Sequence, residues 1–409
     1  MTIFLTSRRR VLLGSVALSL LFVTVFSATA TAGEEGQKPS HPPHWQADID
    51  EEHVRPHIEF LAGDQLKGRS GASARVAAKY ITYHFEKCGL QPLFTDANDS
   101  GAVTFEQPIP GAKSDEGSST VIGYNLGAWI PGSDPQLRDE MIIISAHYDH
   151  LGKRNGVVYP GADDNASGVS MVLAVAKRMA DLKIKPKRSI VFLAFDLEEH
   201  MLWGSRWFAA HTPWPIEQVK LFITADMIGR SIGNLPLPCV FVMGSEHGKG
   251  LDESIDTVGH PEGLEIARLG IDLIGAIPRS DYGAFRDREI PFLFFSTGEH
   301  PDYHTRRDTP DRIDYGKVAR VSSLVNRLTQ HVANRDEAPE WIGETSPNMQ
   351  EVHTLRRITG ILIEQEEAEE YPLTNTQKLM ISQAHNKAGQ IIEQGTFDES
   401  ERSWLIRTA

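Results

Sequence analysis

The chain has 409 residues, of which 40% are hydrophobic and 23% are charged, an ordinary balance for a globular protein with a sizeable core. Its net charge is −14 with histidine neutral. This argues against a nucleic-acid partner, because such binding depends on lysine and arginine at the phosphates. It also argues against a polybasic contact with a membrane surface.

Residues 1–32 are typical of a cleaved export signal. The basic residues Arg8–Arg10 precede an apolar stretch over 11–26, and the small residues at 28–32 suit a signal peptidase. The apolar stretch is shorter than the roughly 20 residues of a membrane-spanning helix, and an uncleaved anchor is the alternative. The run at 7–12 resembles a twin-arginine signal, with the general secretory route as the alternative. We expect an exported protein, periplasmic or extracellular, without a membrane partner after cleavage.

Composition divides the rest of the chain into three parts. Residues 33–49 are polar and proline-rich, which predicts a flexible lead-in. Residues 50–335 alternate strand and helix patterns and predict one α/β domain. Residues 336–409 predict a helical C-terminal extension, in which no chemistry is visible.

The chain contains two cysteines, Cys88 and Cys239. Two thiols are too few for a cysteine-based zinc site. In an oxidising compartment they either pair or remain two free thiols, and the sequence leaves both alternatives open.

The α/β domain shows helical patterns between short apolar runs. Helices are predicted at 73–88, 167–182 and 204–211, and buried strands at 141–146, 189–195, 219–225 and 290–295. This alternation predicts a mainly parallel sheet with helices on both faces. Such sheets bind ligands at the carboxyl ends of their strands.

Side chains that bind metals follow the ends of all four predicted strands. In chain order they are His147, Asp149, Asp163, Asp164, Glu198, Glu199, Asp226 and His304. One aspartate after a strand is usually a turn or helix-cap residue. Four strand ends that each deliver histidine or carboxylate to one sheet edge predict a metal site instead.

Histidine nitrogen and carboxylate oxygen without thiolate suit zinc, cobalt or manganese. The set is larger than one tetrahedral site needs, which favours two metals that share a carboxylate. In the pair Glu198 and Glu199, one can bind metal while the other transfers protons. The residues alone do not say which glutamate does which.

Four motifs match, in order, those of a known family. They are 145–152 (SAHYDHLG), 160–168 (PGADDNASG), the pair Leu197-Glu198-Glu199 followed by Gly204-Ser205, and 302–311 (DYHTRRDTPD), with 226–229 (DMIG) between the last two. The chain resembles the co-catalytic zinc aminopeptidases, a family that includes secreted bacterial leucine aminopeptidases, glutamate carboxypeptidase relatives and glutaminyl cyclases. The resemblance covers roughly residues 54–332.

The resemblance implies a zinc-exopeptidase fold, with a mixed central sheet between helices, and two Zn²⁺ per chain. It assigns one zinc to His147 and Asp226, the other to Glu199 and His304, and the bridging position to Asp164. Glu198 would take a proton from a water that bridges the metals and return it to the leaving amine.

The resemblance implies three further features, and the chain departs from the family pattern at one position. Asp149 would orient His147 as a supporting partner. The hydroxyl of Tyr303 would steady the tetrahedral intermediate, unless Tyr303 is only a packing residue. The Asp164–Asn165 peptide bond would be cis. Leu197 stands where many relatives have glycine.

The predicted function is therefore a metallo-aminopeptidase that acts on a peptide or small amide substrate. Two alternatives share the fold, a glutaminyl-cyclase-like zinc acyltransferase and a non-catalytic binding domain.

Overall fold

The computed structural model describes residues 42–96, 101–113, 119–345, 347–368 and 373–408. The predicted export signal, residues 1–32, lies outside these ranges, as do residues 33–41 of the predicted lead-in. The remaining part of that lead-in contains β1 (His44–Trp45), which pairs in parallel with β13 (His260–Pro261). Its last residues are therefore attached to the folded unit.

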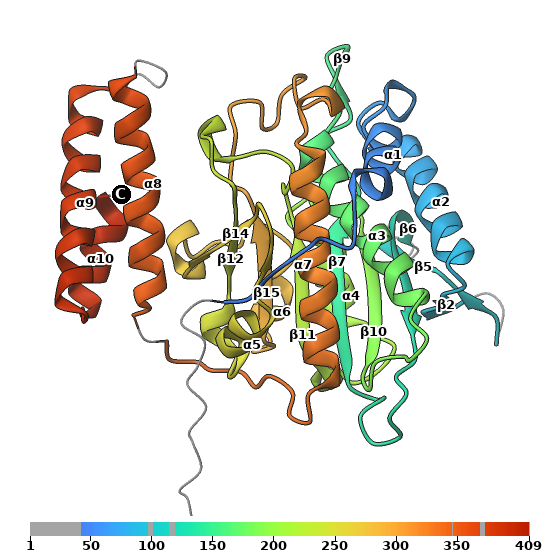
Figure 1. Cartoon of the computed structure of the whole chain (residues 1–409). Coiled ribbons are helices and arrows are strands. Elements are labelled where there is room, and N and C mark those ends of the chain that lie inside the picture. Colours follow the sequence, from blue (N-terminus) through green and yellow to red (C-terminus); the bar gives the residue numbers. More distant parts are fainter. Residues whose placement is uncertain (1–41, 97–100, 114–118, 346, 369–372, 409) are drawn as a thin grey trace, which may run out of the picture. The chain divides into compact units, whose positions relative to one another are not determined.

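A nine-stranded mixed sheet forms the centre of the fold (Figure 1). Its order is β14-β12-β15-β11-β7-β10-β6-β2, with β5 paired to β6. The strands are β2 (Gln91–Pro92), β5 (Glu106–Lys113), β6 (Ser119–Ile130), β7 (Met141–His147), β10 (Ser189–Phe195), β11 (Val219–Ala225), β12 (Cys239–Met243), β14 (Glu265–Leu269) and β15 (Phe292–Ser296).

The four predicted strands are β7, β10, β11 and β15, and they lie side by side in parallel. The sheet becomes mixed because β6 and β12 run antiparallel to the strands at either side of this group. The predicted fold class, a mainly parallel mixed sheet between helices, is confirmed. Two small hairpins lie outside the sheet, β3 (Phe94–Thr95) with β4 (Val103–Thr104) and β8 (Lys153–Arg154) with β9 (Val157–Val158).

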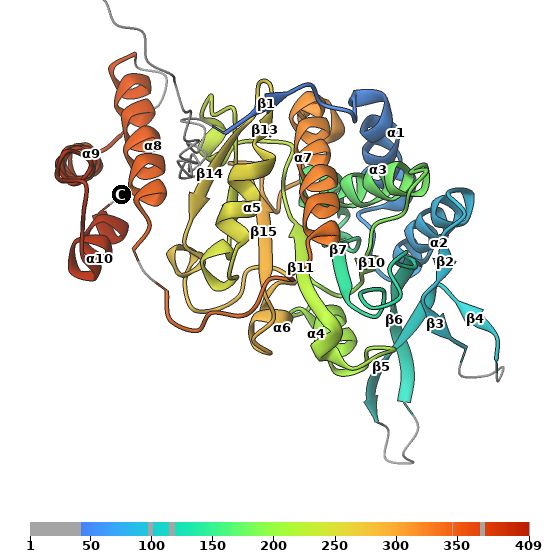
Figure 2. The same cartoon turned by 60° about the horizontal axis from the view of Figure 1, so that its bottom comes forward.

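Helices cover both faces because the central strands are apolar on both sides. In β7, Ile142 and Ile144 enter one hydrophobic cluster and Ile143 enters the other. The first cluster contains side chains of α1 (Glu51–Leu61), α2 (Ala72–Lys87), α3 (Gly168–Ala180), α5 (Leu251–Val258) and α7 (Tyr315–Asn334). The second contains side chains of α4 (Trp203–Ala210) and α6 (Gly283–Arg286). Figure 2 shows the two helical layers on opposite sides of the strands.

The C-terminal residues form α8 (Met349–Glu367), α9 (Asn375–Gln394) and α10 (Glu399–Thr408). Helix α8 packs against β14, and Val352, Leu355, Ala388 and Leu405 join the second cluster. The three helices are therefore part of the packed molecule and lie beside the β14 edge of the sheet (Figure 1).

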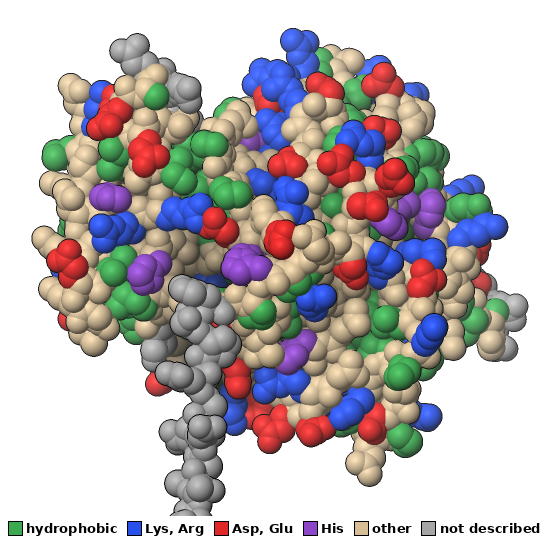
Figure 3. Space-filling view, in the orientation of Figure 1, with side chains coloured by type: hydrophobic (Ala, Val, Ile, Leu, Met, Phe, Trp, Pro, Cys, Tyr) green, Lys and Arg blue, Asp and Glu red, His purple; other side chains and the backbone are tan. Residues whose placement is uncertain are grey.

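Cys88 and Cys239 are both free thiols, so the disulfide alternative is wrong for this structure. None of the helices in the described ranges combines the length and apolarity that crossing a membrane requires. On the face drawn in Figure 3, basic and acidic side chains are interspersed.

Candidate metal centre

The predicted ligands gather at the carboxyl edge of the sheet. His147 is the last residue of β7, Asp226 follows β11 directly, and Glu198 and Glu199 lie just beyond β10. Asp164 lies in the turn Ala162–Ser167 that leads into α3, and His304 lies in the loop after β15. The parallel order of the four strands brings these separate chain segments to one place.

One group of ligand atoms surrounds the His147 ring. Its Nε2 lies 3.3 Å from Asp164 Oδ1 and 3.4 Å from Asp226 Oδ1. Glu198 Oε2 is farther away, 4.0 Å from the same nitrogen. His147, Glu198 and Asp226 thus form one cluster that could hold a metal ion.

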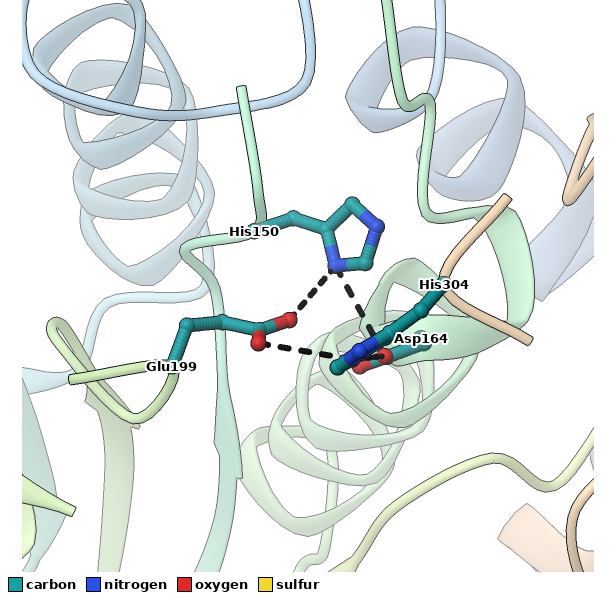
Figure 4. A group of neighbouring side chains, drawn as sticks. All are labelled: His150, Asp164, Glu199 and His304. Carbon is teal, nitrogen blue, oxygen red and sulfur yellow. Dashed lines mark ion pairs between the residues drawn. The ribbon is translucent and has the colours of Figure 1, made fainter. Parts of the chain in front are cut away.

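The second group contains His150, Asp164, Glu199 and His304, which converge in Figure 4. His304 Nε2 lies 3.0 Å from Asp164 Oδ2 and 3.3 Å from Glu199 Oε2. His150 Nδ1 lies 2.8 Å from Glu199 Oε1 and 3.7 Å from Asp164 Oδ2. Asp164 therefore turns one oxygen to each group, as a carboxylate shared by two metals would.

The separations fit zinc. Bonds of about 2.0–2.1 Å in a tetrahedral site place neighbouring ligand atoms about 3.4 Å apart. The four contacts of His147 and His304 with carboxylate oxygens, at 3.0–3.4 Å, lie close to that value. Moreover, His147 Nε2, Glu199 Oε1 and Asp226 Oδ1 are buried and have no hydrogen-bond partner among the described residues. Buried polar atoms normally have partners, and a cation would supply one.

His150 is a candidate that the sequence analysis missed. It belongs to the motif that carries His147, but a histidine three residues beyond the end of a strand has no distinctive spacing. In the structure its ring is buried, and neither nitrogen has a hydrogen-bond partner. Its Nδ1 faces Glu199, so His150 either supports that carboxylate or binds the same ion.

The pKa values of the two adjacent glutamates are shifted in opposite directions. Burial raises the pKa of Glu198 well above its usual value, and the negative charge of Asp226 adds to this, although His147 opposes it. Burial also disfavours the charged form of Glu199, but the rings of His150 and His304 hold its pKa at about 2. Glu199 is thus fixed as a carboxylate, while Glu198 is the stronger base of the two.

Asp149 lies behind the first group. His147 Nδ1 is 3.3 Å from the main-chain oxygen of Asp149 and 3.6 Å from its Oδ1. The Asp149 carboxylate accepts hydrogen bonds from the main-chain N–H groups of Glu198, at 3.1 Å, and Glu199, at 3.4 Å. Asp149 therefore contacts His147, as expected, and also fixes the backbone of both glutamates.

The backbone is unusual at three of the ligand loops. Leu197, Met227 and His304 have φ values of 58°, 57° and 52°, in the left-handed region. Leu197 occupies this conformation where many relatives have glycine, for which it carries no steric cost. The Asp164–Asn165 peptide bond is cis, as the resemblance implies.

Two buried side chains hold the bridging turn, and neither was predicted. Asp308 accepts hydrogen bonds from the main-chain N–H groups of Asp163 and Asp164. The fully buried Arg69 donates to five main-chain oxygens, those of Leu61, Tyr148, Pro160, Gly161 and Asp164. Asp308 stands in the predicted last motif, whereas Arg69 stands in no motif and gave no signal in the sequence.

The Tyr303 ring stacks on the ring of His304, with centroids 3.9 Å apart. Burial raises the pKa of its hydroxyl, and the carboxylates of Asp164 and Asp226 raise it further. Tyr303 therefore stays a neutral hydrogen-bond donor beside the metal centre. The contact also makes it a packing residue, so both roles remain compatible with its position.

A pocket of about 600 Å³ opens beside the metal centre. Asp164, Glu198, Asp226, Tyr303 and His304 are among its lining residues. Its other walls are mainly apolar and come from β12, β14, β15 and α8. The size falls within the range of about 300–1,000 Å³ that is common for small-ligand sites.

Known proteins share this arrangement of elements. The chain is 24% identical over 298 residues to endoplasmic reticulum metallopeptidase 1 of Mus musculus, a match that covers 71% of this chain and 32% of the relative. It spans about a third or less of the first curated relatives it matches.

Solved structures agree on the fold. A zinc aminopeptidase from Bacillus subtilis superposes with a TM-score of 0.53 at 15% identity, covering 74% of this chain and all of that one. Glutaminyl cyclase of Porphyromonas gingivalis gives a TM-score of 0.51 at 16% identity, over 69% and 98% of the two chains. At these identities the likeness shows the fold alone.

The sequence profile of Peptidase family M28 matches residues 125–329, from the middle of β6 into α7. This range holds half of the chain and every residue of the two ligand clusters. On this match, the chain belongs to Peptidase family M28.

Proposed function

We propose that the protein is a zinc-dependent aminopeptidase that removes N-terminal residues from peptides and binds two zinc ions. The observation that carries the proposal is the pair of ligand groups joined through Asp164, with Glu198 beside them and farther from His147 than the other carboxylates. An apolar pocket that begins at these residues supplies a place for substrate.

In this proposal His147 and Asp226 hold one ion, Glu199 and His304 hold the other, and Asp164 contacts both. His150 supports the second group through Glu199. When bound, zinc would polarise the scissile carbonyl and make a nearby water more acidic. The buried carboxylates supply the negative charge that such ions need, because no thiolate is present among these residues.

Glu198 is the proposed general base and acid. Its carboxyl lines the pocket beside the ligands, and burial raises its pKa, which makes the Glu198 carboxylate a stronger base than an exposed glutamate. It would accept a proton from the attacking water and then return one to the leaving amine. Tyr303, held neutral by its surroundings, would donate a hydrogen bond to the carbonyl oxygen as negative charge develops there.

Two alternative functions, a cyclase and a binding domain, would require different features of the site. A glutaminyl-cyclase-like acyltransferase has the same fold, but two separate ligand groups favour two metals over one. A non-catalytic binding domain would not need a proton-transfer group in its pocket, and Glu198 lines the pocket.

The test combines metal analysis with turnover. The protein should contain about two zinc equivalents per chain and hydrolyse aminoacyl-nitroanilides, and a chelator should abolish this activity. Glu198→Gln should keep both zinc equivalents while turnover falls by about 10²–10⁴-fold. Glu364→Gln, at an exposed position on α8, is the matched control and should behave as wild type.

Loss of zinc in Glu198→Gln would show that Glu198 is a ligand rather than the proton-transfer group. A fixed content of one zinc, together with cyclisation of N-terminal glutamine, would favour the cyclase. Zinc binding without turnover of either substrate class would favour the binding domain.

Residues 1–32 support export as a second part of the proposal. The mature chain should then begin near residue 33. N-terminal sequencing of protein recovered from the periplasm or medium tests this, and an intact Met1 there would contradict cleavage.

A further inference from the structure

The C-terminal helices lie outside the family match, which ends at residue 329. Yet Leu355, Ile358 and Thr359 of α8 line the same pocket as Asp164, Glu198 and His304. The three α8 residues stand at positions i, i+3 and i+4, so they share one face of the helix. A segment that the family match does not reach thus forms one wall of the candidate active site.

The wall is apolar and its polar atoms are satisfied. Leu355 and Thr359 are buried, and the Thr359 hydroxyl donates to the main-chain oxygen of Leu355 within the helix. Ile358 is partly exposed and presents the aliphatic surface. Phe241 of β12 and Leu273 of the short helix Ile271–Ile274 also line the pocket, and its charged lining residues Arg279 and Glu299 pair with each other at 3.7 Å. This surface fits an apolar side chain rather than a charged one.

A network of ion pairs holds this wall, with Arg402 and Glu351 buried and Asp272 exposed. Arg402 of α10 donates to both oxygens of Glu351 on α8, at 2.7 and 2.9 Å. It also donates to both oxygens of Asp272, at 2.7 Å each, beside the pocket residue Leu273. Glu351 in turn accepts from the main-chain N–H of Gly270, at 2.9 Å. One guanidinium thus joins α8 to the segment that carries Leu273.

We propose that α8, held by Arg402, is part of the substrate site, and that Ile358 sets the largest apolar N-terminal side chain the pocket accepts. This rests on the proposed aminopeptidase function. The occupant is the N-terminal residue of a peptide, because the same pocket is lined by the groups proposed to act on its carbonyl. The helical extension then determines specificity in addition to packing.

The test compares substrates of increasing side-chain size. Alanyl-, leucyl- and phenylalanyl-nitroanilide are assayed with wild type, Ile358→Phe and Ile358→Ala. Ile358→Phe should lower kcat/KM for the phenylalanyl substrate at least tenfold, and leave the alanyl substrate within about twofold, because a methylene or more of pocket depth is lost. Ile358→Ala should change the preference in the opposite direction, toward phenylalanine over leucine.

Ile363→Phe is the matched control, since Ile363 lies on the same helix but does not line the pocket. It should keep the wild-type order of substrates. If Ile358→Phe and Ile363→Phe give the same profile as wild type, the proposal for α8 is overturned while the aminopeptidase function stands.

A binding measurement separates the two proposals. Ligand-observed NMR reports binding of free L-phenylalanine and L-alanine without any turnover. If wild type hydrolyses none of the substrates, the proposed function fails. Selective loss of L-phenylalanine binding in Ile358→Phe would then still support the proposal that Ile358 of α8 limits the size of the bound side chain. Equal binding of L-phenylalanine by all variants, or none by wild type, would refute it.

Discussion

Arg69 should be more important to stability than any other arginine near the site. Its guanidinium is fully buried and donates to five main-chain oxygens at 2.7–3.2 Å, among them that of Asp164 and that of Gly161 just before its turn. Burial lowers its pKa to about 10, which still leaves it charged at neutral pH. Arg69→Lys keeps the charge but removes the planar fork.

The expected loss follows from the acceptors. An ammonium group has three donors, so it can satisfy at most three of the five oxygens at one time. Gly161 still accepts from the main-chain N–H of Ala166, so at least one other buried carbonyl is left without a partner, at about 1–3 kcal/mol. That is a measurable part of the roughly 5–15 kcal/mol by which folded domains are stable.

Urea unfolding of the metal-free protein measures this loss as a lower midpoint at unchanged slope. Arg154→Lys, at an exposed position in β8, is the matched control and should unfold like wild type. The zinc affinity of Arg69→Lys should also fall, because Arg69 holds the main-chain oxygen of the shared ligand Asp164 and that of Gly161 just before its turn. An Arg69→Lys protein with the wild-type midpoint and zinc affinity would refute this account.

Three other perturbations are informative. Removing zinc should lower Tm in calorimetry. Zinc added back at 100 times its Kd should restore about 2.7 kcal/mol of the free energy of unfolding. An unchanged Tm would show that zinc binding is not coupled to folding. Tyr303→Phe should keep its zinc and lose about 10²-fold in kcat, whereas an unchanged kcat would leave Tyr303 as a packing residue. Arg402→Gln leaves the Glu351 carboxylate buried without its cation, so urea unfolding should show about 3–5 kcal/mol less stability. The exposed Arg407→Gln on the same helix is its control and should lose none.

The sequence allowed a prediction wherever metal-binding side chains stand at the ends of recognisable strands. Strands β7, β10, β11 and β15 were predictable because each is apolar on both faces. The candidate ligands His147 and Asp226 were predictable because they stand at the carboxyl ends of those strands. Their convergence needed only the rule that parallel strands share a carboxyl edge.

Other parts depend on contacts that no local pattern records. Arg69 acts on five oxygens that are up to 95 residues away along the chain. His150 became a candidate only through its distance to Glu199. The place of α8 beside the pocket depends on Arg402, which is 51 residues from its partner Glu351. Amphipathic patterns predict that a helix packs, but not which cavity it closes.

The backbone at the ligands connects these observations. Leu197, Met227 and His304 all adopt left-handed φ values, each at a cost of about 1–2 kcal/mol. A glycine at position 197 would avoid that cost, but its freedom would loosen the segment that carries Glu198 and Glu199. The surrounding hydrogen bonds therefore have to outweigh the strain, and Asp149 provides two of them to that segment. Leu197→Gly should consequently change the position of the glutamates more than the stability of the fold. Leu197→Gly should thus weaken zinc binding while the free energy of unfolding stays almost unchanged. A more stable Leu197→Gly protein with unchanged zinc affinity would show that the strain at Leu197 has no part in holding the site.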